Sequence, residues 1–101
     1  NKEGRHILPY SSILYLESTG HKVIVCTAAG QYELYGKLDE LERSFPPQFI
    51  RCHKSFLVNM DWTDSINKAH QLLLDDGTAL PVSKHRYGRV KERFLGYVVC
   101  K

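Results

Sequence analysis

The chain has 101 residues, of which 43% are hydrophobic and 25% are charged, and its formal net charge is +3 at pH 7. This length predicts a single domain over residues 1–101 and excludes a second one. No run approaches the roughly 20 apolar residues of a membrane span and no signal peptide opens the chain, so we expect a cytoplasmic protein without a membrane partner. The net charge is too small to indicate a nucleic-acid partner by itself.

Short runs rich in β-branched and aromatic residues predict antiparallel strands in the N-terminal half of the chain. Gly20 and Ala29-Gly30 separate successive runs as turns. Pro9 places the end of the first run at a sheet edge or a turn. The strands predicted in this half cover residues 5–9, 13–17, 22–27 and 31–35.

A short amphipathic helix is predicted after these strands, over residues 37–45. Leu38, Leu41 and Phe45 recur at helical spacing, and Pro46-Pro47 ends the pattern. The acidic residues at its start suit the helix dipole. The same acidic residues make this face a poor surface for DNA.

Strand patterns resume in the C-terminal half. Asp75-Asp76-Gly77-Thr78 separates two apolar runs and predicts a hairpin turn. The two aspartates are better explained as turn residues than as a pair of catalytic carboxylates. The strands predicted in this half cover residues 49–51, 56–59, 62–67, 71–74 and 79–82.

A terminal helix is predicted by an apolar stripe at helical spacing, with three arginines on the face beside it. We expect Ser83 to be its N-cap and Gly96 to end it. The stripe consists of Tyr87, Val90, Phe94 and Tyr97, and the arginines are Arg86, Arg89 and Arg93. The whole pattern predicts a mostly β domain of the α+β kind, an antiparallel sheet or sandwich with two short helices.

The three cysteines lack C-x-x-C spacing, so neither a disulfide framework nor a zinc site is predicted. We expect reduced thiols, with Cys26 in the core and Cys100 near the terminus. Cys52 lies between Arg51 and His53, whose positive charge would lower its thiol pKa, and a redox role for it is a hypothesis. The five histidines are too scattered to predict a metal, and no cofactor is expected.

Residues 49–59 place a cationic segment between two short apolar runs. A tight turn between strands is normally small and neutral, but here Arg51, His53 and Lys54 occur within four residues. We therefore expect this turn to contact something outside the chain.

The pattern F-x-R-x-H-x-S-F-x-V-N in this segment is followed by Gly77-Thr78-Ala79-Leu80-Pro81-Val82-Ser83-Lys84. These two motifs, in this order, resemble the LytTR DNA-binding domain, the output module of LytR/AgrA-type bacterial response regulators. The resemblance extends over residues 5–94. It implies an elongated β fold that inserts loops, rather than a recognition helix, into successive major grooves.

The resemblance also implies the partners. They are double-stranded DNA, commonly with paired direct repeats upstream of promoters, and a CheY-like receiver domain that precedes this domain in a full-length two-component regulator. We accordingly expect the chain to be the C-terminal part of a longer transcription regulator. Whether the domain dimerises on DNA is left open.

Three loops, residues 18–22, 51–55 and 83–86, are expected to contact DNA, because base edges require donors at fixed positions and phosphates require cations. Base contacts are expected from His21, from Lys54 and from Lys84 or Arg86. Lysine has three rotatable donors and favours guanine or phosphate, whereas Arg86 supplies the bidentate fork that Lys84 lacks. The residues expected to contact phosphate or to support the loops are Lys22, Arg51, Ser55, Ser83, His85 and Arg89. His53 in the second loop either contacts DNA or is a semi-buried histidine that braces the loop.

Other functional classes have less support in the sequence. Cys52 and His53 are adjacent, so their side chains point to opposite sides of an extended segment and cannot form a nucleophile and base pair. No phosphate-binding glycine-rich loop occurs, and no enzymatic activity is expected. The main alternative is a protein-interaction module, and RNA binding through stacked aromatic residues is a weaker one. The aromatic anchors of the interaction module would be Tyr10, Tyr15, Tyr32 and Tyr35.

Overall fold

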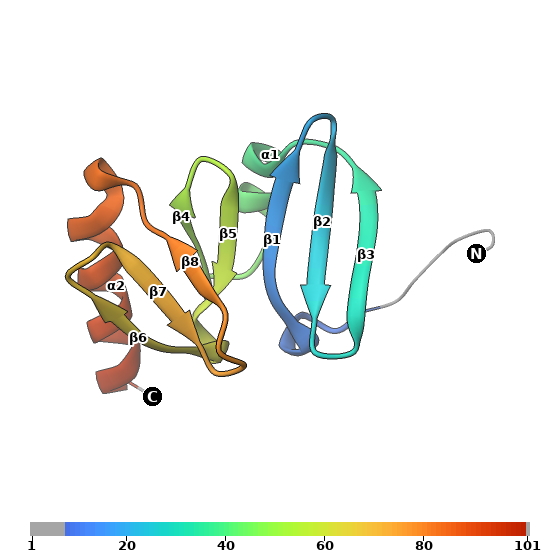
Figure 1. The fold of residues 1–101 in the computed structure, drawn as a ribbon. Coiled ribbons are helices and arrows are strands. Elements are labelled where there is room, and N and C mark those ends of the chain that lie inside the picture. The colour runs from blue at the N-terminus through green and yellow to red at the C-terminus, as the bar shows by residue number, and fades with distance from the viewer. Residues whose placement is uncertain (1–7, 101) are drawn as a thin grey trace.

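Two antiparallel sheets and two helices make up most of residues 8–100, the part of the chain that the computed structural model describes, with side chains to residue 97. The strand order is β3-β2-β1-β5-β4 in the first sheet and β6-β7-β8 in the second (Figure 1). The molecule measures 42 × 26 × 24 Å, which agrees with the expected elongated shape. The strands are β1 (Ile13–Thr19), β2 (Lys22–Thr27), β3 (Gly30–Tyr35), β4 (Phe49–His53), β5 (Phe56–Asn59), β6 (Thr63–Asn67), β7 (Gln71–Leu74) and β8 (Ala79–Pro81).

Strands β1, β2 and β3 form the antiparallel meander that the sequence predicts. Gly20 has φ of 61°, in the left-handed region that favours glycine, at the tight turn between β1 and β2. The turn between β7 and β8 is likewise the predicted hairpin. The strand predicted over residues 5–9 falls mostly outside the described residues, and Leu8 and Pro9 are not in a strand.

The strands β1 and β5 of the five-stranded sheet are buried on both faces. On one face Leu16 and Leu57 belong to a cluster that includes Leu38 of helix α1 (Leu38–Ser44). On the other face Leu14 and Val58 belong to a cluster formed with the small sheet and with helix α2 (Tyr87–Cys100). Strands β1 and β5 therefore sit between two cores, which fixes their side-chain register on both faces.

Both predicted helices are present, and the apolar stripe of α2 packs as expected. Val90 and Phe94 are buried, and Tyr87 and Tyr97 pack against the core. The prediction that Gly96 ends this helix is wrong, because α2 continues to Cys100. No helix in the described part of the chain is long and apolar enough to cross a membrane.

The prediction that the Ser83 side chain caps the terminal helix is also wrong. A short 3-10 helix, η3 (Lys84–Arg86), separates Ser83 from the first residue of α2. Ser83 makes no side-chain capping bond to η3. Its backbone N–H instead donates to the carbonyl of Cys52, which joins the end of β8 to β4.

Asn59 is a buried polar residue at the end of β5, with no exposed surface. Its Nδ2 donates to the carbonyl of Ile13 at 2.9 Å and to that of Tyr10 at 3.3 Å. Its Oδ1 accepts the N–H of Asp61 at 2.9 Å. This amide therefore joins the start of β1 to the connection between the two sheets.

Replacing Asn59 by Leu should destabilise the fold by roughly 1–3 kcal/mol, because the partners would remain buried without a hydrogen bond. Urea unfolding followed by circular dichroism measures the change. The matched control is Gln31→Ala, which alters an exposed amide on β3. An Asn59→Leu variant as stable as the control would show that this amide does not tie the sheets together.

Candidate nucleic-acid interface

The three predicted loops lie at one end of the molecule, the upper end in Figure 1. They are the β1–β2 turn, the β4–β5 turn and the junction from β8 to α2. Two backbone hydrogen bonds join them: Ser18 N–H donates to the carbonyl of Ser55 at 2.8 Å, and Ser83 N–H donates to that of Cys52 at 2.9 Å. The β4–β5 turn is therefore the central part, and the other two loops are attached to its flanks.

Arg51 braces this central turn from within. Its Nε donates to the carbonyl of His53 at 2.9 Å, and its Nη2 donates to the carbonyl of Lys54. Its Nη1 lies 2.7 Å from Asp39 Oδ1 and 2.9 Å from Glu42 Oε1. The Arg51 side chain is only 10% exposed. Because its donors are used within the fold, Arg51 supports the turn, and a phosphate would have to compete with two carboxylates for it.

His53 braces the same turn from the other side. Its Nδ1 accepts the N–H of Ser55 at 3.1 Å, and its ring packs edge-on against Phe56 at 5.8 Å. Burial lowers the pKa of His53, and the nearby charges of Lys54, Arg86 and Arg51 lower it further. The neutral imidazole is thus the favoured form, and Lys54 is left exposed at the tip of the turn.

His21 and Lys22 of the first loop lie in different environments. His21 is exposed, and its backbone carbonyl accepts the N–H of Gly36 at 3.4 Å. Lys22 Nζ lies 3.2 Å from Glu33 Oε1 and 5.8 Å from the centroid of the Tyr35 ring. The hydrogen bond to Glu33 raises the pKa of Lys22. His21 is therefore the more accessible of the two for an external ligand.

The third loop is formed by η3. Lys84 and His85 are exposed, and Arg86 Nη1 lies 3.3 Å from His85 Nε2. Tyr87, which follows, donates its hydroxyl to the carbonyl of Asn67 at 3.1 Å and stacks on His70 at 4.1 Å. These contacts attach the start of α2 to the β6–β7 turn, so η3 is held at both ends.

The expectation that neighbouring cations lower the thiol pKa of Cys52 is wrong. Cys52 has no exposed surface and lies in the core with Val58 and Val82. Burial raises its pKa to about 12, and the opposing effects of Arg86 and Arg51 are smaller. A buried neutral thiol is protected from oxidants, so the geometry gives no support to the redox hypothesis. Cys26 is buried as predicted, and the Cys100 side chain lies outside those described.

The LytTr DNA-binding domain family matches residues 3–95. The chain belongs to the LytTR family. Over 66 residues it is 35% identical to accessory gene regulator protein A of Staphylococcus aureus (strain N315), covering 63% of this chain and 27% of that protein. Over 62 residues it is 29% identical to the transcriptional regulatory protein NatR of Bacillus subtilis (strain 168), covering 60% of this chain and 27% of that protein. It thus spans about a quarter of the length of these curated relatives.

A solved structure with the same fold is the LytTr DNA-binding domain of a putative methyl-accepting/DNA response regulator from Bacillus cereus. The TM-score is 0.76 at 32% identity, and the match covers 88% of this chain and 85% of that one. This similarity confirms the predicted fold class of the LytTR domain.

The contacts of three residues near these loops and the adjoining part of α2 were not predicted from the sequence. Asp39 and Glu42 on α1 neutralise Arg51, and Arg93 on α2 donates to the carbonyl of Pro47 at 2.9 Å. The acidic start of α1 was the available signal for the first two. No spacing rule connects it to an arginine nine to twelve residues later on a strand.

Arg51→Gln should raise the pKa of Asp39 toward its ordinary value of 3.8, because the hydrogen bond from Arg51 is the main cause that lowers it. A carboxyl with a lowered folded pKa contributes stability above its unfolded pKa, and this contribution is lost as pH falls through the folded pKa. Carbon-13 NMR of the carboxylates against pH measures the shift. Arg43→Gln is the control and should have a smaller effect. An Asp39 pKa that is the same in the Arg51→Gln variant as in the unmodified protein would contradict this account.

Proposed function

We propose that this LytTR domain binds duplex DNA sequence-specifically as part of a transcription regulator, with its three loops entering successive major grooves. The observation that carries the proposal is the joining of the three loops at one end of the fold by backbone hydrogen bonds. Sequence discrimination requires donors on a rigid support, which this arrangement provides. The molecule is 42 Å long, enough to span one turn of B-DNA, roughly 34–36 Å.

The proposed base contacts are the exposed or partly exposed nitrogen-bearing side chains at the loop tips: His21, Lys54, and Lys84 or Arg86. Arg86 can present a bidentate fork to guanine, and the lysines can donate to guanine or phosphate. The remaining residues are proposed to position the domain through phosphates or to support these side chains. They are Lys22, Arg51, Ser55, Ser83, His85 and Arg89.

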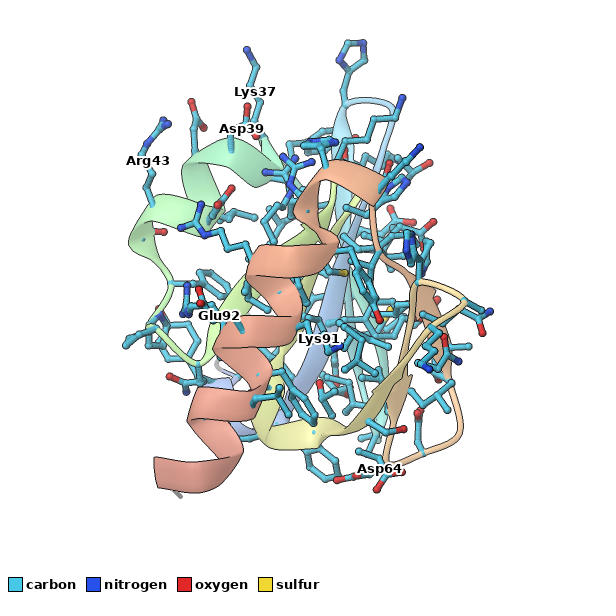
Figure 2. All side chains as sticks on the ribbon, turned by 90° about the vertical axis from the view of Figure 1, so that its left-hand side faces the viewer. Lys37, Asp39, Arg43, Asp64, Lys91 and Glu92 are labelled. Carbon is cyan, nitrogen blue, oxygen red and sulfur yellow. The ribbon has the colours of Figure 1, made fainter. Side chains whose placement is uncertain are left out.

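The charges at the loop end would also orient the domain on DNA. Figure 2 shows Lys37 and Asp39 at this end and Asp64 at the opposite end. Arg51 pairs with both Asp39 and Glu42, and its single positive charge offsets part of their negative charge, so the acidic face of α1 repels phosphates less than its composition predicts. We propose that DNA approaches over the loops and avoids the outer face of α1.

We propose three features of the longer regulator from the family alone. An N-terminal receiver domain precedes this domain, the operators contain paired direct repeats, and binding to these repeats brings two copies together on DNA. The accessory gene regulator and NatR are longer than this chain, which accommodates an additional domain.

The alternative tyrosine-anchored interaction module has less support. Tyr15 and Tyr32 pack against the two core clusters, and Tyr10 packs edge-on against Phe45 at 4.9 Å. Tyr35 is 80% exposed, but strand pairing places it at the opposite end of the sheet from Tyr10. A contiguous aromatic surface for a protein or for single-stranded RNA is therefore not formed by these residues.

Salt dependence tests duplex binding directly. If the loops neutralise about five phosphates, log K should fall with log salt at a slope of roughly −4 to −5. Fluorescence anisotropy with a mixed-sequence duplex at several salt concentrations measures this slope. Single-stranded RNA of the same length is the comparison and should bind more weakly. A slope near zero, or preferred binding of the RNA, would exclude the proposed function.

Lys54→Ala should cost roughly 1–3 kcal/mol against a preferred duplex and less against a random one, because a base contact matters only where the right base is present. The preferred duplex is obtained by selection from a random pool. The matched control is Lys91→Ala, since Figure 2 shows Lys91 partway along α2, away from the loop end. Equal losses of binding free energy on both duplexes would show that Lys54 contacts a phosphate and not a base.

A further inference from the structure

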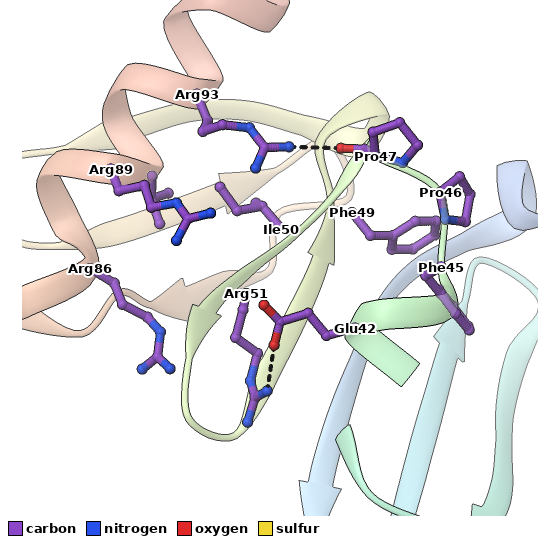
Figure 3. A pocket seen from close by; sticks show the side chains of 11 residues that line it. Glu42, Phe45, Pro46, Pro47, Phe49, Ile50, Arg51, Arg86, Arg89 and Arg93 are labelled. Atoms are coloured by element: carbon purple, nitrogen blue, oxygen red, sulfur yellow. Dashed lines mark hydrogen bonds and ion pairs between the residues drawn. The ribbon is translucent and has the colours of Figure 1, made fainter. Parts of the chain in front are cut away.

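A cleft of about 310 Å³ lies between α2, β4 and the segment that joins α1 to β4. Its size is at the lower end of the roughly 300–1,000 Å³ typical of small-molecule sites. Four arginines and one glutamate supply its charged lining: Arg51, Arg86, Arg89, Arg93 and Glu42. Figure 3 shows the α2 arginines pointing toward β4 and the proline segment.

The positive charge of this cleft is only partly compensated. Arg51 is neutralised by Glu42 and Asp39. Arg93 contacts a neutral carbonyl, that of Pro47, and Arg86 contacts His85. Among the described residues, Arg89 has no hydrogen-bond or ion-pair partner. Three guanidinium groups thus face one cleft without a carboxylate of their own.

The arginines converge because of their spacing. Arg86, Arg89 and Arg93 are separated by three and four residues, which places them on one side of η3 and α2. A guanidinium presents a planar fork of donors that matches the oxygens of a carboxylate or a phosphate. Adjacent forks on one face can therefore bind the same anionic group.

The floor of the cleft is apolar. Phe49, Ile50 and Val90 are buried side chains that line it, together with Phe45 and the two prolines. A bare phosphodiester backbone gains nothing from such a floor. A ligand with an apolar body and one anionic group would cover the partly or fully exposed Phe45, Pro46 and Pro47 and pair with the arginines at the same time.

We propose that this cleft is a binding site for a small amphipathic anion, a carboxylate or phosphate monoester carried on an aromatic or short aliphatic body. The anionic group lies between Arg89 and Arg93, with Arg86 at the loop side, and the body contacts the apolar floor. This site requires no nucleic acid, and it lies beside the DNA-contacting loops because Arg86 belongs to both.

Phenyl phosphate is the probe, titrated into the nitrogen-15-labelled 101-residue chain without DNA and followed by NMR. The expected result is saturable shifts of backbone amides in α2 and β4, with weaker binding of inorganic phosphate and none of phenol. Arg89→Gln should weaken binding roughly tenfold or more, because a charge-assisted hydrogen bond is lost. Arg43→Gln is the control, because Arg43 lies on α1 outside the cleft, and it should leave binding unchanged.

The proposal is overturned if phenyl phosphate produces no saturable shifts, or if Arg89→Gln binds it as tightly as Arg43→Gln does. Equal affinity for inorganic and phenyl phosphate would overturn the amphipathic class of the ligand. Circular dichroism of both variants establishes that they are folded. Because no DNA is present, the result is independent of the proposed DNA-binding function.

Discussion

The guanidinium of Arg51 is the constraint on which the candidate interface depends. It is nearly buried, and it joins two carboxylates of α1 to two carbonyls of the β4–β5 turn. A charge taken out of water is stable only where it is paired and fully hydrogen-bonded, and this geometry meets both conditions. Lysine could not replace it, because a single ammonium group cannot reach carboxylates and carbonyls in a planar fork. The position of Lys54 at the tip thus depends on an interaction with a helix.

The other two loops depend on this turn through the main chain. The hydrogen bonds from Ser18 and Ser83 to its flanks make three separate segments parts of one frame. Beneath the frame, the buried thiol of Cys52 and its neighbours fill the core shared by β4, the small sheet and α2. A thiol in this position serves packing, because burial opposes its ionisation more strongly than the nearby arginines favour it.

Arginines with different partners have different roles in this domain. Arg51 is neutralised by acidic residues and is structural, whereas the arginines of η3 and α2 face a cleft without such compensation. The same residue type, around one cleft, therefore provides internal bracing in one place and a candidate ligand site in another. The charge of Arg86 also lowers the pKa of both His53 and Cys52, although burial is the larger effect on each.

The sequence by itself determined strands β1 to β8, both helices, the core stripe of α2 and the family, because these depend on local periodicity, turn residues and contiguous motifs. Only the tertiary structure decided the environment of individual side chains. The positive charge beside Cys52 was visible in the chain, but its burial was not. The partners of Arg51 lie on another element, and η3 displaced the start of α2 from Ser83. Contacts between distant segments arise from packing, and no local pattern encodes them.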